Sequence, residues 1–264
     1  MASICARALG GIPEVRAGDD LADLIVAAPA GEPLGDGQLV AVAHTIVSKA
    51  EGAVVALADV HPGGRARELA AAAAAEGAAH STDARVVQVV LDEAVEVLRA
   101  ERGVLICRTR QGFVCANAGV DASNASSQQE LILLPRDPDA SARRIRAGLR
   151  QLLGSDGEDA PAPAVLVTDS FGRAWRHGQV DVAIGLAGMQ PLDDWRGRTD
   201  AGGLVLRATW LAVADAAAAA ADLARSKDSR EPVVVIDGLE RFLTAEDGPG
   251  AAELLRPLAE DMFR

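Results

Sequence analysis

The chain has 264 residues, 49% of them hydrophobic and 24% charged, which is enough for a buried core in one large domain or two small ones. Its net charge of −12 argues against non-specific binding to nucleic acid, which needs a basic surface. The three cysteines form no CxxC pair, so we expect reduced thiols and a cytoplasmic protein. No apolar run is long enough to cross a membrane, and the start of the chain has no signal-peptide pattern.

In chain order, the first hundred residues predict a strand, a helix, two more strands and two further helices. The first helix is expected over 21–28, where an aspartate at the N-cap precedes an apolar run. Apolar residues predict strands over 39–47 and 54–57. The alanine-rich segment 62–79 and the spaced apolar residues of 81–102 predict two long helices.

Shorter elements are expected in the remainder of the chain. Strands are predicted over 104–108, 131–134, 165–168, 204–209 and 233–236. Helices are predicted over 142–153, where two preceding prolines delay the start, and over 210–225 and 251–258. Glycine and other small residues in 181–189 predict a close approach between backbones.

This mixture of elements predicts the fold class. Because helices and strands do not alternate regularly, we expect an α+β or mixed α/β fold rather than a doubly wound sheet. The chain contains neither GxGxxG nor GxxxxGK[ST], so neither a Rossmann nor a P-loop nucleotide site is predicted.

A first acidic run, Asn-Ala-Gly-Val-Asp-Ala-Ser-Asn, occupies residues 117–124 after the strand at 104–108. Asp121 is a candidate ligand for Mg²⁺ or Mn²⁺, and Asn124 could hydrogen-bond a phosphate or a base. The alternative is an Asx turn that caps a helix.

A second acidic run, Thr-Asp-Ser-Phe-Gly-Arg-Ala-Trp-Arg, occupies residues 168–176. Asp169 and Ser170 are adjacent oxygen donors at a predicted strand end, which suits a divalent metal beside a phosphate. The alternative is a simple helix N-cap. Arg173 and Arg176 flank Trp175 in a glycine-containing loop, an arrangement typical of anion binding.

Two further polar residues are predicted on the strand at 39–47 or just after it. Lys49 could reach a phosphate as a point charge, or it could be a solvated lysine paired with Glu51. A lone histidine such as His44 is more often structural than catalytic, and no histidines have zinc-ligand spacing. The acids and basic residues together indicate a metal-dependent phosphate site, and the acids alone would also fit a phosphatase or nuclease.

Read together, the motifs resemble those of the coenzyme F420-0:L-glutamate ligase family. The matching stretches occur in the family's order and are residues 11–15, 18–21, 46–52, 112–124, 133–142, 168–176 and 183–188. The resemblance implies a two-lobed F420 gamma-glutamyl ligase-like fold, use of GTP and divalent metal, and a homodimer.

Roles for individual residues follow from the same resemblance. It implies that one or two Mg²⁺ or Mn²⁺ ions are bound by Asp121, Asp169 and Ser170, with K⁺ as a further candidate cofactor. It implies GTP contacts from Ile12, Pro13, Glu14, Val15, His44, Thr45, Lys49 and Asn124. It implies catalytic stabilisation of negative charge by Lys49, Arg173 and Arg176.

The reaction implied has two steps, phosphorylation of the terminal carboxylate of the deazaflavin coenzyme F420-0 by GTP and attack of L-glutamate on the acyl phosphate. Three departures from the family pattern are His44, Ala216 in place of a carboxylate beside Asp215, and Arg225-Ser226-Lys227 in place of a Gly-Lys nucleotide loop. They keep open the alternative of a degenerate homologue that binds nucleotide or deazaflavin without ligating them.

The resemblance also predicts the domain organisation. Residues 1–245 are expected to form the ligase domain, and residues 246–264 resemble the linker that joins it to a nitroreductase-like domain in two-domain relatives. We therefore expect either a free-standing ligase or a shortened form of a two-domain protein.

Overall fold

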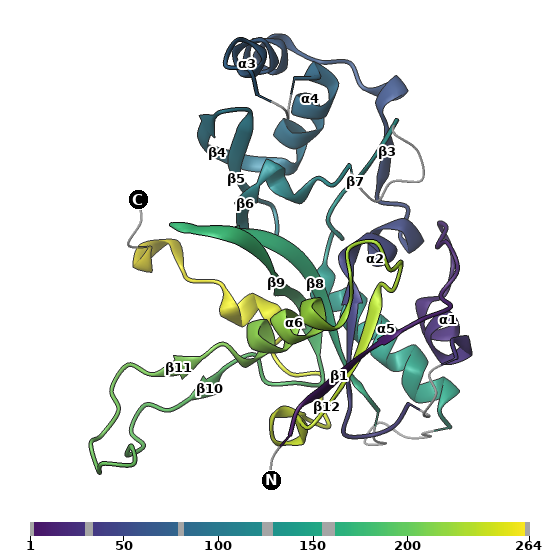
Figure 1. Ribbon diagram of the computed structural model, residues 1–264, viewed down its shortest axis with the longest axis vertical. Coiled ribbons are helices and arrows are strands. Elements are labelled where there is room, and N and C mark those ends of the chain that lie inside the picture. The colour runs from purple at the N-terminus through teal and green to yellow at the C-terminus, as the bar shows by residue number, and fades with distance from the viewer. Residues whose placement is uncertain (1–2, 30–33, 79–81, 123–128, 155–161, 262–264) are drawn as a thin grey trace.

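The computed structural model describes residues 3–29, 34–78, 82–122, 129–154 and 162–261. It has two lobes, a larger one around a five-stranded sheet and a smaller one that carries two helices and a three-stranded sheet (Figure 1). The predicted mixture of helices and strands in a two-lobed fold is confirmed.

The main sheet mixes antiparallel and parallel pairs. Its strands, in spatial order, are β1 (Cys5–Leu9), β12 (Val233–Asp237), β2 (Leu39–Ala43), β8 (Ala164–Arg173) and β9 (Arg176–Ala187). Only β2 and β8 run parallel. In a parallel pair the carboxyl ends of both strands reach the same edge of the sheet. Residues that follow β2 are therefore brought beside the middle of the long strand β8.

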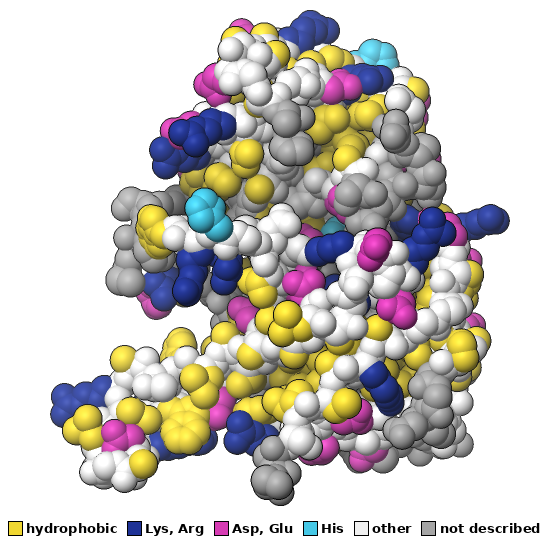
Figure 2. Space-filling view, in the orientation of Figure 1, with side chains coloured by type: hydrophobic (Ala, Val, Ile, Leu, Met, Phe, Trp, Pro, Cys, Tyr) yellow, Lys and Arg dark blue, Asp and Glu magenta, His cyan; other side chains and the backbone are white. Residues whose placement is uncertain are grey.

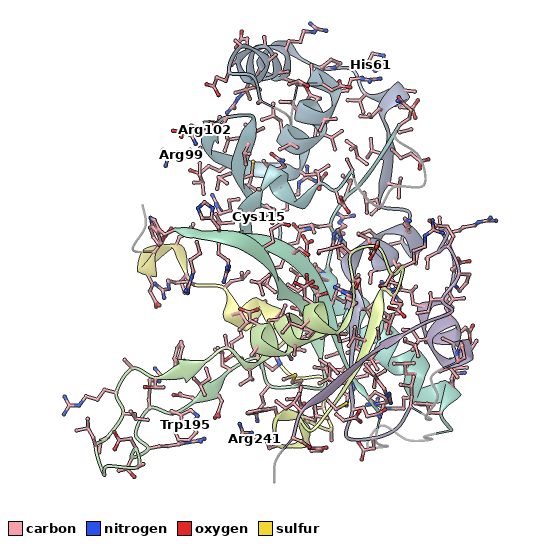
Figure 3. All side chains as sticks on the ribbon, viewed as in Figure 1. His61, Arg99, Arg102, Cys115, Trp195 and Arg241 are labelled. Atoms are coloured by element: carbon pink, nitrogen blue, oxygen red, sulfur yellow. The ribbon has the colours of Figure 1, made fainter. Side chains whose placement is uncertain are left out.

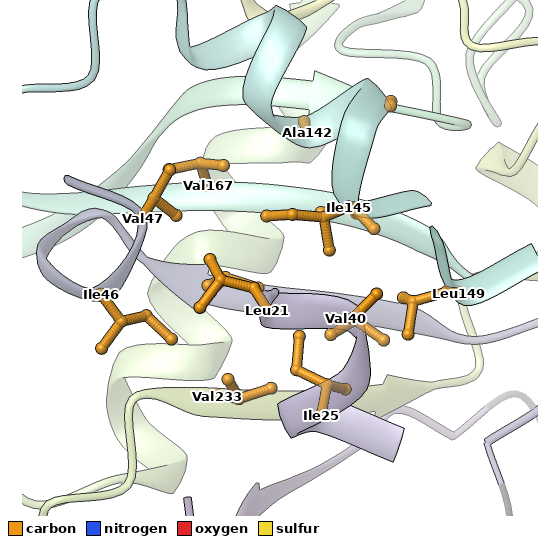
Figure 4. Packing of buried hydrophobic residues seen from close by; sticks show 14 of the residues in the cluster. Leu21, Ile25, Val40, Ile46, Val47, Ala142, Ile145, Leu149, Val167 and Val233 are labelled. Atoms are coloured by element: carbon orange, nitrogen blue, oxygen red, sulfur yellow. The ribbon is translucent and has the colours of Figure 1, made fainter. Parts of the chain in front are cut away.

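Helices cover both faces of this sheet. Helices α1 (Leu21–Ala27) and α5 (Pro138–Leu152) pack on one face, and α6 (Val213–Ala224) packs on the other. Figure 4 shows the first of these cores, whose buried side chains include Leu21, Ile25, Val40, Ile145 and Leu149. Each such fully buried side chain stabilises the fold by about 1.5–3 kcal/mol.

The smaller lobe has its own core. It contains α3 (Gly64–Ala75) and α4 (Ala84–Glu93), which pack on a sheet of β4 (Ala94–Glu101), β5 (Val104–Thr109) and β6 (Val114–Ala116). The α3 alanines and the apolar face of α4 meet residues of β5 in this cluster. Strand β6 leads directly into the described part of the first acidic run, residues 117–122.

The remaining elements connect the lobes or extend from them. Strand β3 (Val54–Ala56) follows the short helix α2 (His44–Ala50) and pairs with β7 (Glu130–Ile132), which comes much later in the chain. A long hairpin projects from the larger lobe and carries β10 (Asp193–Asp194) and β11 (Trp210–Leu211) (Figure 1).

Two predicted elements each turn out to be two. The strand expected over 39–47 is β2 followed by α2, because Ile46 and Val47 bury themselves in the core from a helix. A short apolar run cannot distinguish these two conformations. The helix expected over 81–102 is α4 followed by β4, because pairing of residues 94–101 with β5 overrides their helical spacing.

Three other boundaries were predicted wrongly. Residues 204–209 form no strand, only an isolated bridge at Val205, because this exposed segment has no sheet to join. The helix expected over 251–258 is two short 3₁₀ turns separated by Pro257. Helix α5 starts at Pro138 rather than at 142, since proline suits the first helical position and Asp137 caps it.

The glycine-containing segment 181–189 makes the close backbone contact that its composition predicts. A Cβ at Gly185 would lie 2.2 Å from the carbonyl oxygen of Pro138, so only glycine lets α5 sit on β9 at this distance. By contrast, a Cβ at Gly172 on the neighbouring strand would meet nothing within 4 Å.

The described part of the predicted linker packs on the larger lobe. Arg146 of α5, with 2% of its side chain exposed, bonds to Asp247 at 2.8 Å and to the carbonyl oxygens of Thr244 and Ala245. Ala251 is fully buried in the core beneath α6. The proposed boundary at residue 245 therefore falls within a packed segment, and the division into domain and linker stays a prediction.

Candidate active site

A cavity of about 1110 Å³ lies between the two lobes. Both lobes contribute to its lining. Most of the lining residues fall within the ranges 12–15, 43–49, 115–121, 168–172 and 225–232, and Gln179 and Asp181 complete it. Figure 2 shows acidic and basic side chains on the surface where the lobes meet, and Figure 3 places Cys115 at the same junction. The two acidic runs predicted as a site thus face one cavity from opposite lobes.

The parallel pair of strands brings His44 and Asp169 together. Ala43 and Thr168 are partners in the β2–β8 register, so the next residue of each chain segment reaches the same edge. His44 Nε2 lies 3.3 Å from Asp169 Oδ1, and the histidine side chain is 4% exposed. His44 is the first residue of α2 rather than a strand residue, and its buried Nδ1 has no hydrogen-bond partner.

A buried carboxylate that sequence analysis missed organises the second acidic run. Asp181 on β9 lies opposite Ser170 in the hairpin register and has no exposed side-chain surface. It accepts hydrogen bonds from Ser170 Oγ at 2.6 Å and from Thr168 Oγ1 at 2.9 Å, and it forms an ion pair with Arg225. The available signal was an acid in the otherwise apolar segment 180–187 of β9, at a position fixed by the hairpin.

Both lysines of the chain lie at the cavity. The chain has 26 basic residues, but only Lys49 and Lys227 are lysines, and both line the cavity. Lys49 Nζ bonds to Glu14 at 2.6 Å, so the alternative pairing with Glu51 is wrong; Glu51 bonds to α5 instead. Lys227 Nζ donates to Ser170 Oγ at 2.7 Å. A lysine behaves as a compact, hydrated point charge, which suits transient contacts with phosphate.

The first acidic run meets the cavity through a 3₁₀ turn and a bridge. The backbone of Asp121 exchanges hydrogen bonds with Ile132 at 2.9 and 2.8 Å, and Asp121 is one of the residues that line the cavity. The preceding turn over Asn117–Gly119 is held partly by Asn117 Oδ1, which accepts a bond from the Leu105 amide. Asn124 lies outside the described residues, so its predicted GTP contact and the Asx-turn alternative stay predictions.

The second acidic run lies in strands rather than in the predicted loop. Strand β8 continues through Asp169 to Arg173, so the alternative of a helix N-cap at Asp169 is wrong. Arg173 and Arg176 flank the hairpin turn, do not line the cavity, and Arg173 donates to the carbonyl oxygen of His177 at 2.8 Å. Trp175 between them is 82% exposed. The structure therefore does not bring these two arginines to the site, and a role in catalysis stays a prediction.

The remaining predicted nucleotide contacts do line the cavity. Ile12 to Val15 form one wall, and Thr45 follows His44 in the first turn of α2. Of the departures from the family pattern, Arg225-Ser226-Lys227 also line it. Ala216 is exposed on α6 and away from the cavity, so the carboxylate missing there would not face this site.

The cavity thiol is not suited to nucleophilic chemistry. All three cysteines are free, and Cys115 lines the cavity. Burial, together with the nearby Asp169 and Cys107, raises the pKa of the Cys115 thiol to about 12. The thiol therefore stays protonated at neutral pH, whereas the thiolate is the reactive form.

The oxygen donors fit a metal that binds together with a phosphate substrate. Asp121, Asp169 and Ser170 present two carboxylates and a hydroxyl to one cavity. Within the described ranges, no group of three or more His, Cys, Asp or Glu residues is arranged to hold a metal ion. Mg²⁺ typically takes one or two carboxylates and completes its shell with water and substrate phosphates. Such a partial shell is what these residues offer.

This charged cavity between the two lobes, lined by residues with hydroxyl, carboxylate and lysine groups, is the candidate active site. Residues 11–238 match the family model described as F420-0:Gamma-glutamyl ligase, and the chain belongs to this family. Among the described helices, none combines the length and apolar character needed to cross a bilayer.

Curated relatives agree with the family assignment over almost their whole length. The chain is 42% identical over 253 residues to the coenzyme F420:L-glutamate ligase of Methanopyrus kandleri, covering 95% of this chain and 94% of the relative. It is 41% identical over 257 residues to the enzyme of that name from Methanothermobacter thermautotrophicus, with 96% of each covered. The Halobacterium salinarum enzyme of that name is 43% identical over 260 residues, with 95% and 96% covered.

Proposed function

We propose that this enzyme is a GTP-dependent ligase that joins L-glutamate, in amide linkage, to the deazaflavin coenzyme F420-0. Membership of the ligase family supports the ligase activity and the substrates. The observation that carries the finer proposal is the meeting, in one cavity, of segment 12–15 and Lys49 with the oxygen donors Asp121, Asp169 and Ser170. These groups suit the binding of a nucleoside triphosphate with its metal.

In the proposed reaction, an oxygen of the F420-0 carboxylate attacks the γ-phosphorus of GTP and GDP leaves. The amino group of glutamate then attacks the carbonyl carbon of the acyl phosphate, loses a proton, and phosphate leaves as the amide forms. Divalent metal at the cavity would neutralise phosphate charge and hold the reacting groups in line. In this proposal Lys49, with 11% of its side chain exposed and now bonded to Glu14, would exchange that carboxylate for a phosphate oxygen.

Mass spectrometry of a complete reaction tests this proposal. Purified protein is incubated with F420-0, L-glutamate, GTP and Mn²⁺, and the molecular mass of the deazaflavin is measured. We expect a product heavier by one or more glutamyl units, formed together with GDP and absent without glutamate. Asp169→Asn should abolish the product. Asp194→Asn should not, because Asp194 is half exposed on the long hairpin and does not line the cavity.

Two other results would contradict the proposal and identify the alternatives. GTP binding with no mass increase would favour a degenerate homologue that binds without ligating. Release of phosphate from GTP at the same rate with and without glutamate, with the deazaflavin unchanged, would favour a phosphatase.

A further inference from the structure

The direction of the hydrogen bonds at Ser170 can be assigned from chemistry alone. Lys227 Nζ lies 2.7 Å from Ser170 Oγ, and an ammonium group can only donate. Ser170 Oγ is therefore the acceptor in this bond, and its own proton goes to Asp181 Oδ1 at 2.6 Å. The hydroxyl oxygen consequently presents only lone pairs to its cavity side, and a lysine cation occupies one of them.

Asp181 is held so that this orientation persists. Thr168 Oγ1 and the Arg225 guanidinium bind its other oxygen, and its side chain is completely buried. Arg225 is itself fixed by a bond to the carbonyl oxygen of Pro232 at 3.1 Å and has 12% of its side chain exposed. With both oxygens occupied, the carboxylate cannot rotate away from Ser170 without breaking buried bonds.

Lys227, in contrast, is poorly held. Its side chain is 74% exposed, and its ion pair with Asp222 is long, with 3.8 Å between Nζ and Oδ1, which is beyond hydrogen-bond distance. The same residue is one of only two lysines in a chain with 24 arginines. A single strong bond on an exposed, flexible stem is easily exchanged for another cation at the same oxygen.

We propose that Lys227 is a place-holding cation, whose ammonium group occupies the ligand position on Ser170 Oγ and leaves it when a divalent metal binds. Asp181 is the positioning residue that keeps this oxygen an acceptor. The inference rests on the proposed function, because it takes Ser170 as a metal ligand. Two cations on one hydroxyl oxygen repel each other, so metal binding and the Lys227 contact exclude one another.

Mn²⁺ binding to the full chain without nucleotide tests the proposal. Free Mn²⁺ is measured by its electron paramagnetic resonance signal during titration. Lys227→Met removes the competing charge on an exposed residue, and we expect Mn²⁺ affinity to rise about fivefold or more. Arg230→Met is the matched control, because Arg230 carries an exposed positive charge in the same cavity, whereas the described bonds of Ser170 Oγ go to Asp181 and Lys227. It should raise the affinity by less than about twofold.

A second substitution separates competition at Ser170 from a general charge effect. In a Ser170→Ala background, Lys227→Met should no longer raise Mn²⁺ affinity, because the contested oxygen is gone. A gain that persists in that background, or an equal gain in Arg230→Met, would overturn the proposal.

Asp121→Asn distinguishes failure of this inference from failure of the proposed function. We expect it to weaken Mn²⁺ binding whatever Lys227 does. If Asp121→Asn and Ser170→Ala both leave Mn²⁺ binding intact, the metal site itself is wrong and the inference falls with it. If both weaken binding while Lys227→Met changes nothing, the metal site stands and the place-holding role alone is wrong.

Discussion

Substitution of Asp181 by asparagine should destabilise the protein through the charge that it leaves behind. Breaking a buried ion pair by removing one partner costs about 3–5 kcal/mol, and here the partner Arg225 is 12% exposed. Asparagine keeps the shape and one acceptor oxygen, and Arg225 retains its bonds to Thr168 and Pro232. These retained bonds reduce the loss, so we expect the free energy of unfolding to fall by about 2–4 kcal/mol.

Urea unfolding followed by circular dichroism measures this loss, and a double-mutant cycle assigns its cause. Arg225→Met alone should also destabilise, because it leaves the Asp181 carboxylate without its counter-charge. The double variant should lose less than the two single losses together, since neither charge is then left unpaired. A loss below about 1 kcal/mol for Asp181→Asn, or strict additivity in the cycle, would refute the buried-pair reasoning.

Three further predictions concern packing, the C-terminal segment and pH. Gly185→Ala should lower the free energy of unfolding, measured by thermal unfolding, by more than about 2 kcal/mol, because the new Cβ would clash with the backbone of Pro138. Gly172→Ala, measured in the same way, should be nearly neutral. Arg146→Met removes the bonds to Thr244 and Asp247, so it should lower the free energy of unfolding by about 2–4 kcal/mol and speed amide hydrogen exchange over 244–251. The control Arg143→Met should have neither effect. Burial raises the pKa of the Asp215 carboxyl above its ordinary 3.8, so the folded state binds this proton more tightly than the unfolded one. The free energy of unfolding of the wild type, minus that of Asp215→Asn, should therefore fall as pH rises from 3.8 through the raised pKa. If this difference, measured by urea unfolding, stays constant with pH, the reasoning is contradicted.

Sequence reasoning located the site better than it described the elements that carry it. The acidic runs at 117–124 and 168–176 were predicted to act together, and the structure brings Asp121 and Asp169 to one cavity. Their juxtaposition depends on the parallel pairing of β2 with β8, which lies in no local pattern of the sequence. The wrong predictions of a single strand over 39–47 and a single helix over 81–102 also have a long-range cause. In both segments, packing or strand pairing with distant residues decided between helix and strand.

Register explains both what sequence reasoning missed and what it misplaced. The predicted strand ended at 168, so the following residues were treated as a loop with arginines turned to the site. Continuation of β8 to Arg173 moves the two arginines out to the hairpin turn and sets Asp181 opposite Ser170. A shift of one residue would place Asp181 on the other face of the sheet, so this bond could not be anticipated without the hairpin.

The charges that line the cavity bear on how an acidic chain binds anionic substrates. Among the described residues, four basic side chains face five carboxylates, and the basic ones are Lys49, Arg225, Lys227 and Arg230. Lys49 is paired with Glu14, Arg225 with Asp181 and, at 3.8 Å, Lys227 with Asp222, so at least half of this positive charge is already neutralised. With a net charge of −12 on the whole chain, the lining is not by itself a basic pocket for a triphosphate. In the proposed reaction, metal that arrives with the nucleotide, and lysines that can change partners, would supply the missing positive charge.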